Sequence, residues 1–141
     1  MRTLLLVLHI GAAIVFVGPA TFATSAFVRY AAAESLGVAR ALHRVSRLYG
    51  GATLAVPIVG LVLAALQGYL TQGWLLVSLV LFFGAMGLLM QGIVPAQARA
   101  VAAIEAGGSL ASRERTLLRA TAAAFAVAWV VVLALMVAKP F

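Results

Sequence analysis

The sequence predicts an all-α integral membrane protein: an antiparallel four-helix bundle with a cytoplasmic amphipathic helix or helical extension before the second span. Hydrophobic residues make up 65% of the 141-residue chain, against roughly 45–50% in an average soluble domain. Only three residues are acidic and ten are Lys or Arg, too few charges to cover a soluble surface. The apolar residues fall into long runs separated by short polar connections, and each run can cross a hydrocarbon core of about 30 Å.

The first span is expected at about residues 3–28, closed by Arg29 and Tyr30 at the interface. A helix of roughly 26 residues rises about 39 Å, enough to cross the membrane with some tilt. The run is longer than the core of a cleavable signal peptide, so we predict that it is retained. Pro19 removes one backbone hydrogen bond within it and is expected to bend the helix.

The second span is expected at about residues 52–70, after a segment of different character, residues 34–49. Apolar residues fall on one side of a helix there, and the other side carries Arg40, His43, Arg44 and Arg47. The segment is either a helix on the membrane surface or an extension of the second span. Arg40, Arg44 and Arg47 are predicted to contact anionic lipid headgroups.

The third span is expected at about residues 74–94, ending at Pro95, and the fourth at about residues 117–137. Residues 71–73 should form a tight turn, and residues 99–112 a polar loop centred on Gly107 and Gly108. The chain ends in a short tail, Lys139 to Phe141. All four spans are expected to form a single transmembrane domain, residues 1–141.

The basic residues predict the orientation. Arg2 and Lys139 lie on one side of the predicted membrane, and eight arginines flank the first and third connections: Arg29, Arg40, Arg44, Arg47, Arg99, Arg113, Arg115 and Arg119. The positive-inside rule places these connections in the cytoplasm and both termini outside it. Arginines at the ends of apolar runs favour anionic lipid over nucleic acid as the partner. The absence of cysteine excludes disulfides and thiolate metal sites.

Small residues are expected to hold the bundle together, because helices in lipid associate through close packing. Gly11, Gly18 and Ser25 recur every seven residues on the first helix. Others lie on the third and fourth helices: Gly84, Gly87, Ala122, Ala126 and Ala134. These stripes could also contact a partner membrane protein or a second copy in a homodimer.

His9 is the residue most indicative of function, because a titratable group within a span points to a functional site. It lies roughly 9 Å deep by helical rise, on a face of small residues that should point into the bundle. It is either a ligand or redox residue, or a neutral imidazole bonded to a neighbouring helix. Gln67, Tyr69, Trp74 and Met136 share its depth. The Tyr and Trp are typical interfacial anchors, whereas His9 with Met136, or with a second His9, could ligate haem iron or copper.

Polar residues nearer the cytoplasm favour structural roles. His43 is interpreted as part of a solvated basic face. Gln91, Thr53 and Thr121 are expected to exchange hydrogen bonds between helices. No Asp, Glu or Lys lies within the predicted spans, which argues against a classical secondary transporter. Serine-nucleophile, phosphate-loop and metalloprotease patterns are also absent.

The stretch Leu8-His9-Ile10-Gly11 through Gly18, the basic helix and the Gly73-Trp74 start of the third span resemble a family of small bacterial predicted integral membrane proteins, a domain of unknown function. The resemblance implies a bacterial inner (plasma) membrane location. A more distant resemblance is to copper-resistance protein D and to the haem-binding membrane protoporphyrinogen oxidase. In the oxidase family a histidine near the start of the first helix ligates haem, which implies that role for His9. The lysine that the oxidase family has in a later helix is missing here.

Three functions follow from these observations. The favoured one is a non-enzymatic accessory or oligomerising membrane protein, because no catalytic constellation is assembled. The second is binding of haem b or copper through His9, with Met136 as a second candidate ligand. The third is lipid or small-molecule handling in a cavity between the helices.

Overall fold

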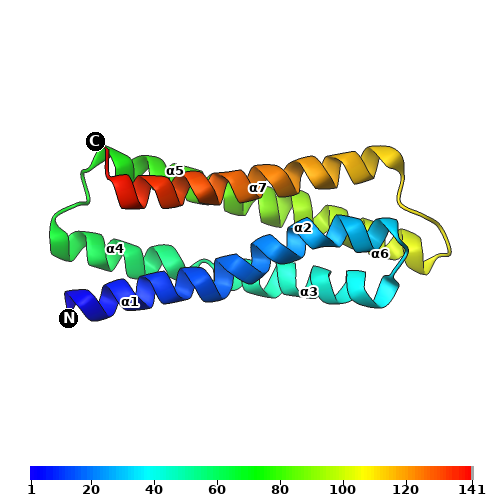
Figure 1. The fold of residues 1–141 in the computed structure, drawn as a ribbon, viewed down its shortest axis with the longest axis horizontal. Helices are drawn as coiled ribbons and strands as arrows, with labels where there is room; N and C mark the ends of the chain where they lie inside the picture. Colours follow the sequence, from blue (N-terminus) through cyan, green and yellow to red (C-terminus); the bar gives the residue numbers. More distant parts are fainter. Residues whose placement is uncertain (141) are drawn as a thin grey trace.

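Four antiparallel spans form the bundle, each built from one or more helical segments (Figure 1). A computed structural model describes residues 1–140. The segments are α1 (Arg2–Ala12), η1 (Ala13–Val17) and α2 (Gly18–Ala32); α3 (Leu36–Ala52) and α4 (Ala55–Gln67); α5 (Gly73–Gly87), η2 (Leu88–Ile93) and α6 (Val94–Glu105); and α7 (Ser112–Ala138). No strand occurs among these residues, and the four long helices are apolar enough to cross a membrane. The predicted all-α membrane bundle is confirmed.

The two ends of the bundle differ in chemistry. The start of α1, the end of α7 and the α4–α5 turn lie together at what we call the terminal end (Figure 1). The α2–α3 and α6–α7 connections, with the eight arginines that flank them, lie at the opposite, arginine end. The 32-residue helix from Leu36 to Gln67 is about 48 Å long, well beyond a hydrocarbon core of about 30 Å. The excess lies in α3, so the helical part of the 34–49 segment, residues 36–49, extends the second span, as the second alternative predicted.

Three of the spans contain a proline, and each is irregular beside it. The wide π-helical segments η1 and η2 end two residues before Pro19 and Pro95, respectively. Before Pro57 the helix is interrupted at residues 53–54, and the carbonyl of Thr53 accepts a bond from the Val56 amide instead. A proline donates no backbone hydrogen bond and its ring crowds the preceding turn, so a widened or broken turn relieves the conflict. The fourth span has no proline before Pro140 and is one continuous α-helix.

The third span is longer than the sequence predicted. We expected the helix to end at Pro95 and residues 99–112 to form a loop, but α6 continues to Glu105. Pro95 stands in the first turn of α6, where its missing amide hydrogen removes little, because η2 has already absorbed the irregularity. The actual connection, residues 106–111, turns at Gly107, whose φ of 81° suits glycine.

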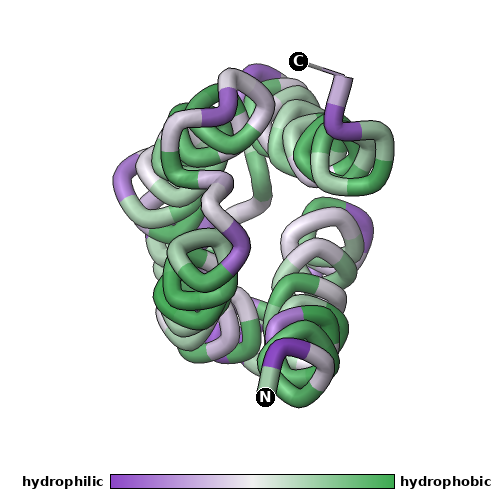
Figure 2. The backbone as a smooth tube through the Cα atoms, turned by 90° about the vertical axis from the view of Figure 1, so that its left-hand side faces the viewer, coloured by the Kyte–Doolittle hydropathy of each residue, from purple (hydrophilic) through white to green (hydrophobic). Residues whose placement is uncertain are grey.

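Packing is dense at the arginine end and loose at the terminal end. The dense core contains Phe27, Ala31, Leu42, Ala100 and Leu118, from four different helices. By contrast, α1 and η1 have no buried residue. At the terminal end α1 packs on α4 and α5 packs on α7, and the ends of α1 and α7 lie apart when viewed along the bundle (Figure 2).

The glycine stripe predicted on the first helix does not pack within the bundle. A Cβ added at Gly11, Gly18, Gly84 or Gly87 would meet no atom within 4 Å. One reason is that η1 lies between Gly11 and Gly18 and interrupts the α-helical repeat. The close approaches occur instead at Gly50, against Leu89, and at Gly60, against His9.

Candidate functional site: a cavity lined by His9

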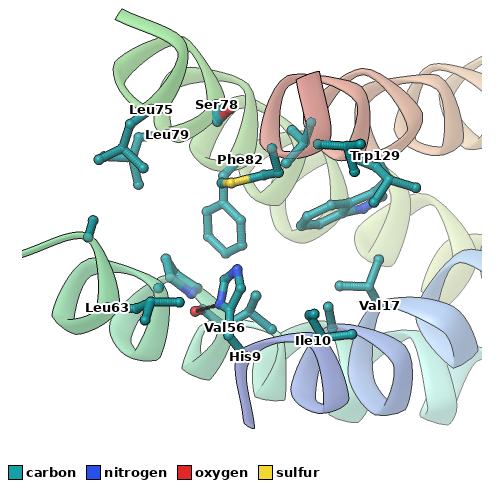
Figure 3. A pocket seen from close by; sticks show the side chains of 18 of the residues that line it. His9, Ile10, Val17, Val56, Leu63, Leu75, Ser78, Leu79, Phe82 and Trp129 are labelled. Atoms are coloured by element: carbon teal, nitrogen blue, oxygen red, sulfur yellow. Dashed lines mark hydrogen bonds between the residues drawn. The ribbon is translucent and has the colours of Figure 1, made fainter. Parts of the chain in front are cut away.

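A cavity of about 850 Å³ lies between the α1/α4 pair and the α5/α7 pair in the terminal half of the bundle. His9 and Val56 lie on one side of it, and Phe82 and Trp129 face them from the other (Figure 3). Most of the lining is aliphatic or aromatic. Sites for small molecules typically measure about 300–1,000 Å³ and combine an apolar wall with a few polar groups, so this cavity has the size and character of a binding site.

Aromatic residues form part of the cavity wall on the α5/α7 side. The Trp129 ring packs edge-on against Phe82, with ring centroids 5.5 Å apart, and against Phe125 at 5.9 Å. Phe125 is completely buried and Phe82 is 4% exposed. Such edge-to-face pairs are favourable beyond the area that they bury, so this wall should be rigid.

Toward the bilayer the cavity is bordered by exposed apolar residues. Ile14 and Phe22 on the first span and Val130 and Leu133 on α7 line it, yet each is more than 60% exposed. In a membrane these side chains face lipid. A molecule dissolved in the bilayer could therefore enter between the first span and α7 without crossing water.

His9 is held in a defined orientation. Its Nδ1 lies 3.1 Å from the backbone carbonyl oxygen of Val56. A carbonyl only accepts, so Nδ1 carries the proton, and in the neutral ring Nε2 has a free lone pair. That nitrogen points toward Phe82, into the cavity (Figure 3). A histidine that donates one ring N–H to a carbonyl and presents the other nitrogen is well arranged to bind a metal or accept a hydrogen bond.

Gly60 makes room for this arrangement. A Cβ at position 60 would lie 2.7 Å from Cε1 of His9 and 3.1 Å from Nδ1, closer than side chains tolerate. The imidazole therefore packs directly on the α4 backbone. Sequence reasoning identified His9 but not Gly60, because nothing in the sequence indicates which helix faces His9.

Two residues that line the cavity each carry a buried polar atom without a hydrogen-bond partner within residues 1–140: Oγ1 of Thr21 and Nε1 of Trp129. The hydroxyl of Ser78, by contrast, donates to the Trp74 carbonyl at 2.7 Å. A buried polar atom without a partner is unfavourable by roughly 1–3 kcal/mol. Both atoms are buried beneath the cavity surface, so the accessible polar group that this wall offers is the imidazole of His9.

The residues predicted to share the depth of His9 do line the same cavity: Gln67, Tyr69, Trp74 and Met136. Trp74 is only 5% exposed and belongs to a small core with Leu75 and Ala64, so its interpretation as an interfacial anchor is wrong. The ammonium of Lys139 lies 4.8 Å from the centre of the Tyr69 ring and 5.6 Å from that of Trp74. A cation thus stands where the cavity meets the terminal end.

A separate polar network lies in the arginine half. Gln97 is completely buried, its Oε1 is 3.1 Å from Nδ1 of His43, and its amide donates to Ser46 at 3.2 Å. Ser46 in turn donates to the carbonyl of Leu42. His43 is therefore half-buried in a network joining α3 to α6 rather than part of a solvated face. Sequence reasoning missed Gln97 because it placed the helix end at Pro95, although the spacing from Ile93 through Gln97 to Val101 continues a buried helical face.

The hydrogen bonds between helices that were predicted for the other polar residues are not found among residues 1–140. The hydroxyl groups of Thr53 and Thr121 donate to carbonyls of their own helices, which uses the one proton that each could have donated to a neighbouring helix. Gln91 is exposed. The expected interhelical bonds among these residues do not form. Arg40 pairs with Glu105, whereas Arg44 and Arg47 are exposed and free to meet headgroups.

Metal binding through several protein ligands finds no support in residues 1–140, which hold no group of three or more His, Cys, Asp or Glu side chains. His9 and Met136 both line the cavity. A cofactor with its own ligand framework, such as haem, would need only one or two such residues.

Comparison with known proteins identifies the family of the chain. Residues 3–140 match the family model described as predicted integral membrane protein (DUF2269), which confirms the resemblance to a family of this kind. Neither the curated proteins nor the solved structures include a match.

Proposed function

Because the chain belongs to the DUF2269 family of predicted integral membrane proteins, we propose its function from the cavity: it binds a lipid-soluble molecule between its helix pairs, with His9 as the recognition residue. The observation that carries the proposal is the hydrogen bond from His9 Nδ1 to the Val56 carbonyl, which leaves Nε2 directed into an apolar space of about 850 Å³. The proposal follows the third function predicted from the sequence, lipid or small-molecule handling between the helices, rather than the accessory role that the sequence favoured. Its support is the size and apolar lining of the cavity.

The polar atoms of the cavity define what the molecule should carry. Nε2 of His9 accepts a hydrogen bond, so it requires a donor such as a hydroxyl group. The rest of the wall favours an apolar body. A hydrophobic molecule with a small head that contains a hydroxyl or another hydrogen-bond donor meets these conditions.

A second candidate is haem b, because His9 presents Nε2 as an axial ligand would and Met136 lines the same cavity. The apolar wall suits the macrocycle, and Lys139 at the terminal end could pair with a propionate. Bound haem would supply electron-transfer or oxygen chemistry. Copper is the weaker form of this candidate, because the cavity lacks a multidentate ligand set.

We also propose that the arginine end faces the cytoplasm, with both termini outside it. The support is the distribution of basic residues, eight at one end against two at the other. A reporter enzyme fused after Phe141 should be active only outside the cytoplasm. Activity of the same fusion inside would reverse the orientation.

The ligand proposal is tested by purifying the protein in mild detergent and analysing what accompanies it, by absorption spectroscopy and by mass spectrometry of an organic extract. We expect one apolar compound at near-stoichiometric amount, reduced at least tenfold in His9→Ala. Val7→Ala, on the lipid-facing side of α1 at 61% exposure, should retain it. A Soret band present in wild type and lost in His9→Ala would identify the compound as haem.

A steric test complements it. Gly18 lines the cavity and Gly11 does not, although neither has an atom within 4 Å of an added Cβ. Gly18→Leu should therefore expel the compound while Gly11→Leu leaves it in place. Equal content in wild type, His9→Ala and Gly18→Leu would refute the proposal.

A further inference from the structure

A second hollow lies at the arginine end, on the seam between α2 and α7. It has a volume of about 520 Å³ and lies outside the His9 cavity. Its walls come from one face of each helix: Ser25, Val28, Arg29 and Ala32 on α2, and Arg115, Arg119, Ala122 and Ala123 on α7. The steps of three and four residues on both helices place these side chains in line along the seam.

Three arginines thus converge on one groove without a carboxylate. The one ion pair found within residues 1–140 is Arg40 with Glu105, and no acidic residue lines this groove. Like charges held together repel each other. An anion in the groove would relieve this repulsion.

The donor set favours phosphate. Guanidinium groups present several N–H donors in a planar fork that matches phosphate oxygens, and the resulting bonds are charge-assisted. Basic pockets between transmembrane helices are a recognised type of lipid-headgroup site. The small side chains of Ala32, Ala122 and Ala123 leave the volume that a phosphate group requires.

The continuation of the seam favours a lipid over free phosphate. Phe22 lies two turns before Arg29 on α2, and Val127 and Val130 follow Ala123 on α7; all three are more than 60% exposed. Phe22 and Val130 also border the His9 cavity. An acyl chain attached to a phosphate in the groove would have an apolar path along the seam, about 10 Å from Arg29 to Phe22 by helical rise.

We propose that this groove binds the phosphate of an anionic phospholipid through Arg29, Arg115 and Arg119, with the acyl chains lying along the α2–α7 seam. The site is distinct from the exposed arginines of α3 and does not depend on what the His9 cavity holds. It makes the lipid a specific component of the protein surface rather than part of a diffuse charged layer.

The test is lipid binding by native mass spectrometry of protein in detergent, with phosphatidylglycerol, phosphatidylcholine and inorganic phosphate added in parallel. Wild type should bind phosphatidylglycerol in preference to the other two. The double variant Arg115→Gln/Arg119→Gln should weaken this binding by roughly 25-fold, about fivefold for each arginine. The matched control Arg99→Gln/Arg113→Gln removes the same charge at the same end from two exposed residues outside the groove. It should change phosphatidylglycerol binding less than threefold.

A second pair of variants tests the groove without changing its charge, in case the arginine variants misfold. Ala123 lines the groove and Ala124 does not, and both are exposed. Ala123→Leu should reduce phosphatidylglycerol binding at unchanged charge, while Ala124→Leu should not. Equal losses in the two arginine pairs, or in the two leucine variants, would overturn the proposal. So would inorganic phosphate that competes at equal concentration, because the site would then recognise the anion without the lipid.

Discussion

Replacing Gly60 by alanine should change the orientation of His9 while leaving the free energy of unfolding of the bundle nearly unchanged. The added Cβ would lie 2.7 Å from Cε1 of His9, where ordinary contacts begin at 3.4 Å. The ring must therefore move by about 0.7 Å. The bond from Nδ1 to Val56, already 3.1 Å long, would then exceed the range of a hydrogen bond.

The energetic terms nearly cancel. Alanine in place of glycine within a helix stabilises by about 0.5–1 kcal/mol. Loss of one hydrogen bond between membrane helices costs about 0.6–1 kcal/mol. We therefore expect the free energy of unfolding to change by less than about 0.5 kcal/mol. Affinity for the cavity ligand should nevertheless fall about tenfold, as it does when the partner that orients a ligating histidine is removed.

The assay is reversible unfolding in mixed detergent micelles, followed by circular dichroism, for a double-mutant cycle with His9→Ala. In the His9→Ala background there is no ring to displace, so Gly60→Ala should stabilise by about 0.5–1 kcal/mol. The control is Gly84→Ala, because a Cβ at Gly84 meets no atom within 4 Å; it should stabilise equally in both backgrounds. A Gly60→Ala variant that is equally stabilised in both backgrounds and retains full ligand affinity would refute the reasoning.

Three further perturbations probe the rest of the bundle by the same unfolding measurement. Gln97→Leu removes two hydrogen bonds of a fully buried side chain and should lower the free energy of unfolding by about 1–3 kcal/mol. The control Gln91→Leu, at an exposed site, should leave the free energy of unfolding nearly unchanged. Similar losses in the two variants would show that the His43–Gln97–Ser46 network is not formed. Phe125→Ala should lower the free energy of unfolding by about 3–5 kcal/mol because this ring is completely buried. The exposed control Val127→Ala should lower it by less than about 1 kcal/mol. A small loss for Phe125→Ala would contradict a rigid aromatic wall. Glu105→Gln breaks the exposed Arg40 pair and should cost less than about 1 kcal/mol, an effect that disappears at high salt; a larger or salt-independent loss would mean that the pair is shielded from solvent.

The sequence predicted the parts of the fold that depend on single helices. Length and apolarity identified the four spans, and the spacing of Arg40, Arg44 and Arg47 identified the amphipathic character of α3. The error at Pro95 arose because a proline ordinarily ends a helix, and the sequence does not reveal that η2 widens the backbone before it. Helix boundaries near prolines therefore depend on backbone geometry that composition does not report.

The candidate site was predictable only in its central residue. His9 stood out because imidazole is rare within a span, but its partner is a backbone carbonyl, which has no sequence signature. The cavity arises because α1 packs on α4 and α5 on α7 at the terminal end, a choice made by tertiary packing. The Arg29–Arg115–Arg119 groove likewise joins residues nearly 90 positions apart in the chain, and their convergence becomes visible only once α2 and α7 are placed side by side.

The widened segment η1 has a consequence for the rotation of the first span. A π-type turn accommodates one more residue than an α-turn, and one residue corresponds to about 100° around the axis. His9 lies before η1, and the packed face of α2, from Ala20 to Ala31, lies after it. If the same five residues were wound as a regular α-helix, with α2 fixed by its packing, His9 would turn about 100° away from Val56. Deleting a single residue between Ala13 and Val17 should restore a regular α-helix and leave His9 facing Val56, because the widened turn absorbs one residue. The five residues of η1 therefore set the angular register that aims the imidazole into the cavity.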